Sequence, residues 1–141
     1  TVPPPTMMTL NAAAREICIV RTDQTTTPLQ ALTMMNNITF VESARFLAER
    51  VMKTKGVSHS RRIAQAFRMV TSREPSPDEL KRLLADFRFY LADFKKRPEA
   101  AKQLLTVGQK KADAKLSVIQ LASYALVTNT ILNLDEAIVQ D

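Results

Sequence analysis

The chain has 141 residues, of which 45% are hydrophobic and 24% are charged, and this composition suits one globular domain. Its two glycines are too few for the turns of a β-sandwich or barrel, and its single cysteine and single histidine exclude an internal disulfide and a zinc site built from those two residues. The net charge of +6 is compatible with a nucleic acid, a membrane surface or an acidic polysaccharide as partner, and equally with solubility alone.

Residues 1–27 are expected to form an extended N-terminal arm. The chain begins without methionine or a signal-peptide pattern, continues with three consecutive prolines and contains the short apolar run 17–20, which includes Cys18. One strand without a partner does not make a sheet, so we predict an irregular arm that lies on a helical body formed by residues 28–141. We interpret the chain as a fragment of a longer protein and Cys18 as an inert thiol in this arm.

The helical body is predicted to start at Thr27. Thr27 suits the N-cap position, Pro28 the first helical position, and Gln30 the reciprocal position of a capping box. We therefore predict a helix over residues 28–35. Asn36 and Asn37 are expected to end this helix and to begin the next one, because asparagine tolerates the left-handed conformation and also caps helices.

A second helix is predicted over residues 38–55, with Gly56 just after its last turn. Six apolar residues, at positions 40, 41, 44, 47, 48 and 51, fall on one helical face. The charged residues are expected on the opposite, exposed face, and these are Glu42, Arg45, Glu49 and Arg50.

Four more helical segments follow after residue 57. Ser58 is expected to cap a helix to residue 71, Ser76 and Pro77 to start one that reaches residue 96, and Pro98 to start a shorter one that ends before Gly108. A polar loop over 110–115 precedes residues 116–132, which are apolar nearly all round and predict a central buried helix, too short and too interrupted by polar residues to span a membrane. With a terminal turn over 135–138, the pattern predicts an all-α single compact domain of about six helices.

The positive charge is concentrated in two stretches. Residues 51–73 carry six basic and no acidic residues, and residues 95–115 carry seven basic and two acidic residues. Arg61, Arg62 and Arg68 are expected opposite the apolar face of their helix, where they form either a solvated surface or a basic patch for phosphate or sulfate groups. A nucleic acid is disfavoured as partner, because the chain has no tryptophan and no helix with a base-reading cluster.

Most catalytic motifs are absent from the sequence. Two glycines exclude the glycine-rich phosphate loops and the nucleophile elbow, and one histidine excludes H-E-x-x-H. Glu79 is interpreted as the capping-box partner of Ser76, and Asp78 as an acidic residue at the positive end of the same helix. Asp135 and Glu136 are likewise interpreted as residues of a helix start. We expect no catalytic set, no cofactor and no metal site in this segment.

Several motifs resemble a domain of unknown function from planctomycete bacteria. The family shows R-E-x-C-x-V-R, T-P-L-Q-A-L-x-x-L-N-D, F-V-E-x-A-R-x-L-A-E-R, A-F-R-x-x-x-x-R-x-P-x-x-x-E-L and a closing L-L-N-L-D-E. The matching segments of this chain are residues 15–21, 27–37, 40–50, 66–80 and 131–136. Asn37 stands where the family has aspartate, and Met34 and Met35 fill the two positions before Asn36, the second of which is leucine in the family.

The resemblance implies the C-terminal part of a large exported protein that also carries a cytochrome-c-like domain, and hence an extracytoplasmic location. Polar residues within or beside these motifs are the candidate binding residues, namely Arg21, Gln30, Asn36, Asn37 and Arg45. For Gln30 and Asn36 the alternative is helix capping, and for Arg45 it is a surface ion pair with Glu42 or Glu49.

Three functions are compatible with these observations. The first is a structural or interaction module that packs on the other domains of its parent protein. The second is a contribution of site residues to an exported redox or polysaccharide-acting enzyme, and the third is an anion-binding module for a glycan or a nucleic acid. An anionic polysaccharide is the partner that the lifestyle of such bacteria suggests.

Overall fold

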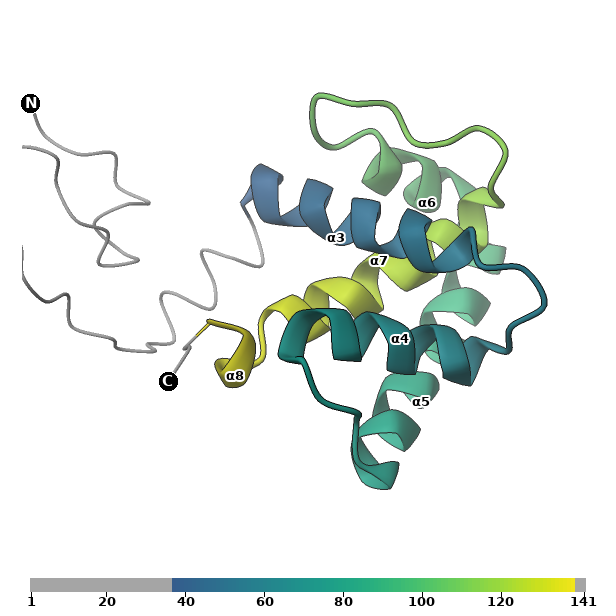
Figure 1. Cartoon of the computed structure of the whole chain (residues 1–141). Helices are drawn as coiled ribbons and strands as arrows, with labels where there is room; N and C mark the ends of the chain where they lie inside the picture. The colour runs from purple at the N-terminus through teal and green to yellow at the C-terminus, as the bar shows by residue number, and fades with distance from the viewer. Residues whose placement is uncertain (1–36, 139–141) are drawn as a thin grey trace, which may run out of the picture.

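The computed structural model describes residues 37–138, which form six helices (Figure 1). In chain order these are α3 (Ile38–Met52), α4 (His59–Thr71), α5 (Pro77–Lys96), α6 (Pro98–Leu105), α7 (Val118–Leu132) and α8 (Asp135–Ile138). No strand occurs within this range, so the all-α prediction is confirmed. The predicted arm over 1–27 and the helix over 28–35 lie outside the described residues.

The starts of α3, α4 and α5 were predicted correctly from the sequence. The side chain of Asn37 accepts a hydrogen bond from the amide of Thr39 at the start of α3, and that of Ser58 accepts one from the amide of Arg61 at the start of α4. Ser76 forms the predicted capping box at the start of α5. Each cap satisfies amide groups that the first turn of a helix leaves without partners.

Two helix boundaries, the end of α3 and the start of α7, differ from the prediction. α3 ends at Met52 instead of residue 55, and Gly56, with φ +71°, lies in the turn beyond it rather than directly after the helix. α7 begins at Val118 instead of residue 116, because Ser117 is still in an extended conformation. Both differences fall at boundaries, where hydrophobic periodicity carries little information.

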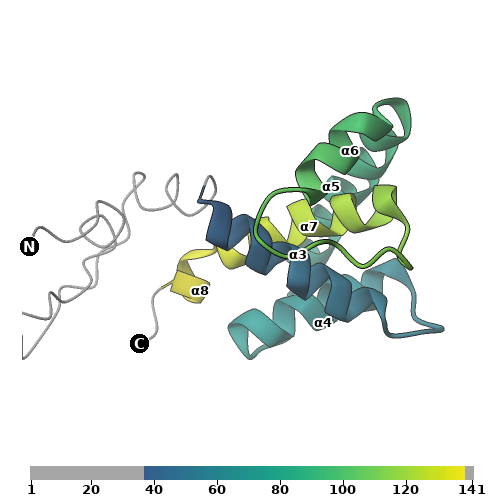
Figure 2. The ribbon, with the colours of Figure 1, turned by 90° about the horizontal axis from the view of Figure 1, so that it is seen from above.

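Helix α7 is the centre of the domain, as its apolar sequence predicted. It contacts each of the other five described helices, and Figures 1 and 2 show it enclosed between them. Its side chains join those of α3, α4 and α5 in one core, whose largest fully buried apolar members are Tyr124, Phe67, Phe87, Ile63, Leu121 and Ile131. Within residues 37–138, no helix is long and apolar enough to cross a membrane.

The longest connection of the described fold joins α6 to α7 through residues 106–117. It has no regular secondary structure and arches past α3 before it enters α7 (Figures 1 and 2). A connection of this length needs partners for its own amide and carbonyl groups. α3 supplies them through charged side chains.

Candidate functional site

Three charged residues of α3, which we call the α3 charged cluster, lie under the connection between α6 and α7. They are Glu42, Arg45 and Glu49, at positions i, i+3 and i+7 of one helical stripe. The exposed fraction of Arg45 is 2% and that of Glu49 is 8%. The expectation that both lie on an exposed face was therefore wrong, and Arg45 is not part of a surface ion pair but is among the most buried side chains of the domain.

Arg45 donates hydrogen bonds to main-chain carbonyl groups far along the chain. Its Nη1 lies 2.8 Å from the carbonyl oxygen of Leu105 and 3.5 Å from that of Val107, and its Nη2 lies 2.5 Å from that of Lys110. These carbonyl groups belong to the end of α6 and the connection that follows. The guanidinium fork is suited to this task, because it presents five donors in a fixed plane.

The two glutamates accept hydrogen bonds from amides of the same connection. Oε1 of Glu42 lies 3.0 Å from the amide of Gln109 and 2.9 Å from that of Lys110, and Oε1 of Glu49 lies 3.3 Å from the amide of Asp113. Oε1 of Glu42 also lies 3.4 Å from Nη2 of Arg45. The cluster thus supplies acceptors for the amides and donors for the carbonyl groups of one irregular segment.

The close approach of the connection to Glu42 depends on Gly108. This glycine has φ +104°, a conformation that residues other than glycine rarely adopt, and a Cβ atom there would lie 2.6 Å from Cδ of Glu42. Gly108 therefore has two independent reasons to be glycine. The other glycine, Gly56, has a similar positive φ but no neighbouring atom within 4 Å of such a Cβ.

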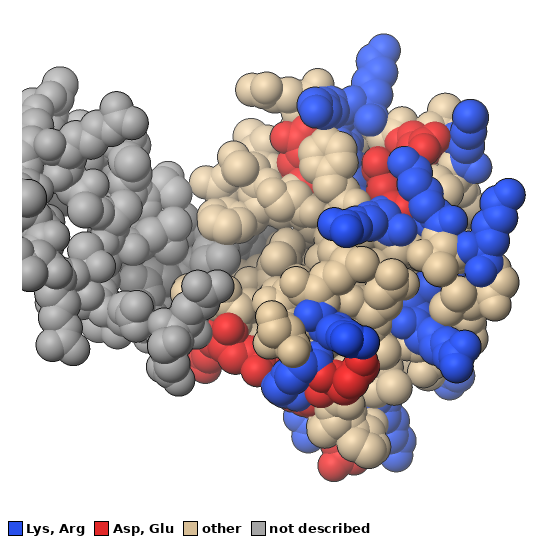
Figure 3. Space-filling model, viewed as in Figure 1, with Lys and Arg blue, Asp and Glu red and all other residues tan. Residues whose placement is uncertain are grey.

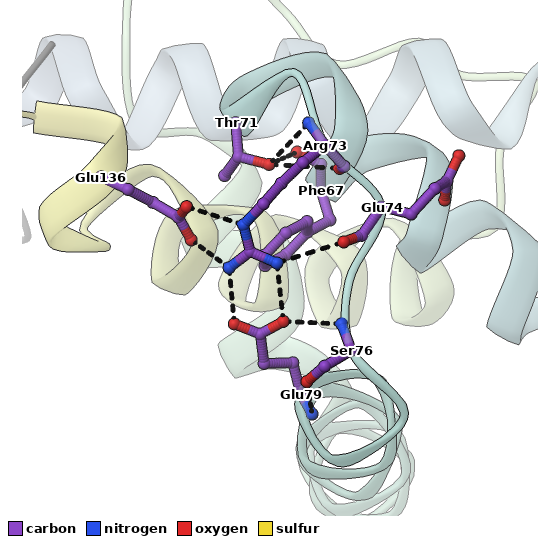
Figure 4. Close-up of polar contacts among 7 residues, drawn as sticks. All are labelled: Phe67, Thr71, Arg73, Glu74, Ser76, Glu79 and Glu136. Atoms are coloured by element: carbon purple, nitrogen blue, oxygen red, sulfur yellow. Dashed lines mark hydrogen bonds and ion pairs between the residues drawn. The ribbon is translucent and has the colours of Figure 1, made fainter. Parts of the chain in front are cut away.

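A second cluster, the Arg73 cluster, joins the end of α4 to α5 and α8 (Figure 4). Arg73 donates to both carboxylate oxygens of Glu79, at 2.9 and 2.7 Å, and to both of Glu136, at 2.9 and 2.6 Å. Its guanidinium group also lies over the ring of Phe67, 4.8 Å from the ring centroid. Such bidentate pairs fix geometry as well as charge, so this cluster holds α8 against the α4–α5 corner.

The Arg73 hydrogen bonds, followed by that of the Ser76 amide, lower the pKa of Glu79 to about 2. The sequence predicted Glu79 as the capping-box partner of Ser76, and the 2.7 Å bond from the Ser76 amide confirms this. It did not predict the pairing with Arg73 or the role of Glu136. Glu79 therefore caps α5 and also binds the arginine that precedes the helix.

The remaining candidates from the resemblance have different positions. Asn37 is the N-cap of α3, with its Oδ1 2.9 Å from the amide of Thr39, which gives it a folding role that needs no charge. Arg21, Gln30 and Asn36 lie outside the described residues.

The basic residues predicted on α4 do not share one environment. Arg61 is exposed, and Arg68 is exposed and lies 3.3 Å from Glu74. Arg62 was expected on the solvated face, but it is half-buried, and its Nη2 donates to the carbonyl oxygen of Thr54 at 3.1 Å. Figure 3 shows that Lys and Arg side chains instead gather over the α6–α7 connection and on the side where α3 ends and α4 begins.

His59 is the one histidine of the chain, and its partners suggest packing rather than catalysis. Its Nδ1 lies 2.6 Å from the hydroxyl oxygen of the buried Tyr124, and its ring lies 4.8 Å from that of Phe87. Burial, and then the charges of Arg62 and Arg88, lower its pKa. No carboxylate orients the imidazole in the described fold, so the pair lacks the third member that an activated nucleophile needs.

The described residues thus define a helical domain whose charged motif side chains bind other parts of the same domain. They contain no group of three or more histidine, cysteine, aspartate or glutamate side chains that suits a metal ion. The family described as Protein of unknown function (DUF1553) matches residues 1–87, and the chain belongs to this family. No curated protein and no solved structure matches the chain.

Proposed function

We propose that the chain is a structural and interaction module of a larger exported protein, in which it packs on the neighbouring domains. One observation carries the proposal. Arg45 and Arg73, which belong to the family-like segments 40–50 and 66–80, donate hydrogen bonds to groups of the same domain. Arg45 and Arg73 bind groups about 60 positions along the chain. Side chains used in this way stabilise a fold, and this supports a structural role for the segments that carry them.

The resemblance to domains of exported planctomycete proteins supports the context of this proposal. It suggests an extracytoplasmic location and a parent chain with a cytochrome-c-like domain, whose other domains are the partners we propose. Two large apolar side chains are available for such contacts, because the exposed fraction is 62% for Ile38 and 68% for Phe89. They lie on α3 and α5, so they mark two separate places to test.

Removal of residues 28–141 from the longer protein tests the proposal. We expect the truncated protein to lose stability or the association of its domains, measured by thermal unfolding and limited proteolysis. Substitutions Ile38→Ser and Phe89→Ser in the intact protein are expected to weaken the same association, whereas Arg50→Ser, on an exposed side chain of α3, serves as control. Full activity of the truncated protein with unchanged stability would contradict the proposal.

An anionic polysaccharide is a second candidate partner, favoured by the basic side chains over the α6–α7 connection and where α3 ends and α4 begins (Figure 3). Binding to such a polymer is dominated by charge and weakens steeply with salt. We therefore expect heparin to bind at low salt and to dissociate as salt rises, and a flat titration at low salt would remove this candidate.

A further inference from the structure

A pocket of about 530 Å³ lies between α6, the α6–α7 connection and the first turns of α7. This volume is within the usual range for small-molecule sites. Its apolar lining includes Leu105 and Leu121, which are 6% and 1% exposed, together with Leu116 and Val118. Side chains of this kind offer a surface for the apolar part of a ligand.

The wall of this pocket is held in place before any ligand arrives. Gln109, Lys110 and Asp113 line it, and their amides are those that the glutamates of the α3 charged cluster bind. A site whose wall is already ordered loses little conformational entropy on binding. The α3 charged cluster thus has a consequence beyond stability, because it shapes a cavity.

The charged side chains that line the pocket are mainly positive. Three lysines line it, Lys102, Lys110 and Lys111, against the single carboxylate of Asp113. That carboxylate accepts a hydrogen bond from the amide of Lys115 at 3.0 Å and lies 3.3 Å from Nζ of Lys53, so its charge is already compensated. The net charge of the lining therefore favours an anionic group on the ligand.

The three lysines differ in the contacts that their ammonium groups already make within the domain. Nζ of Lys102 lies 2.8 Å from Glu99 in an exposed pair, and Nζ of Lys110 lies 5.8 Å from the ring centroid of Phe46. Lys111 has no ion pair or side-chain hydrogen bond within residues 37–138. Exposed pairs of this kind are weak, so Lys102 can exchange Glu99 for a ligand at little cost.

We propose that this pocket binds a small organic carboxylate with an apolar body, whose carboxylate meets Lys102 and Lys111 while the body lies on the leucine floor. The first turn of α7 adds to the preference, because Ser117 makes no side-chain cap and the amides there carry partial positive charge. No aromatic side chain lines the pocket, and this disfavours a sugar ring or a base as ligand. The inference is independent of the proposed packing on other domains.

The test uses the whole chain and three probes with the same alkyl group, octanoate, 1-octanol and octylamine, followed by amide chemical shifts in NMR titrations. We expect octanoate to bind most tightly and octylamine least. The signals expected to move are those of residues of the pocket wall, namely Gln109, Lys111, Ala112 and Leu116. Equal affinity for the three probes, shifts elsewhere in the chain, or no binding would overturn the proposal.

Variants separate the pocket from a general effect of charge. Lys102→Gln combined with Lys111→Gln is expected to weaken octanoate binding by about threefold or more. The control combines Lys95→Gln with Lys96→Gln, which removes the same charge from exposed positions at the end of α5 and is expected to leave binding unchanged. An equal loss in both double variants, or no loss in either, would overturn the site.

A further variant tests the apolar part of the pocket. Ala114 is exposed at the pocket wall, so Ala114→Phe adds a ring there without disturbing the core. We expect this variant to remain folded and to lose octanoate binding. Unchanged binding by folded Ala114→Phe would show that the ligand does not enter the pocket.

Discussion

Replacement of Arg45 by alanine is the most informative perturbation of the fold. The side chain is 2% exposed and donates to carbonyl groups of Leu105 and Lys110, at 2.8 and 2.5 Å. Its loss leaves these carbonyl groups without a charged donor, leaves Glu42 and Glu49 without their nearest cation, and opens a cavity. Removing one partner of a buried ion pair costs about 3–5 kcal/mol.

This cost is large on the scale of the whole domain, since native domains are stable by about 5–15 kcal/mol. We expect the melting temperature of Arg45→Ala to fall by about 10 °C or more. Urea and thermal unfolding followed by circular dichroism measure both quantities. Arg45→Lys is expected to recover only part of the loss, because an ammonium group is a single point charge and cannot reproduce the planar fork.

Arg50→Ala is the matched control, since Arg50 is exposed on the same helix. It is expected to change the free energy of unfolding by no more than about 0.5 kcal/mol. If Arg45→Ala were as stable as Arg50→Ala, the reasoning that Arg45 is a buried structural residue would be refuted.

Three further predictions concern the same contacts. Gly108→Ala is expected to destabilise the domain more than Gly56→Ala in urea unfolding, because both positions have positive φ but only the Cβ at Gly108 would collide with another residue; equal losses would contradict the collision. Asn37→Ala is expected to lower the free energy of unfolding by about 0.5–2 kcal/mol and Asn37→Asp to leave it unchanged, because only an acceptor is needed at this cap. A loss of stability in Asn37→Asp would show another role for Asn37. The pKa of Glu79 is lowered from 4.5 to about 2, so its contribution to stability is complete above pH 4.5 and is lost as the pH falls towards 2. Arg73→Gln should therefore make the free energy of unfolding fall less steeply over this pH range, measured by urea titrations at successive pH values. An unchanged slope would count against the pairing.

The helices were predictable because their signals are local. Asn37, Ser58 and Ser76 are caps that a few neighbouring residues reveal. The nearly uniform apolar composition of residues 116–132 identified the central helix without any knowledge of its partners. The boundaries were predicted less well at the C-terminal end of α3 and at the start of α7, where no cap or breaker of the expected kind fixes them.

The buried state of Arg45 and Glu49 was not predictable from hydrophobic periodicity, which assigns every charged residue to the outer face. Their partners are main-chain groups of a segment about 60 positions away, and main-chain groups leave no pattern in a sequence. The one available signal was the spacing of Glu42, Arg45 and Glu49 along one stripe beside Ala44 and Ala48, which are fully buried. Charged residues in a stripe beside small buried residues can themselves be buried, by contact with another segment of the chain.

Amide hydrogen exchange tests most directly whether the charged residues of α3 hold the α6–α7 connection. In the unaltered chain, the amides of Gln109 and Lys110 are expected to exchange slowly, because both donate to Oε1 of Glu42. Glu42→Ala is expected to abolish this protection while the amides of α5 remain protected. Fast exchange of both amides in the unaltered chain, or the same protection in Glu42→Ala, would contradict the account.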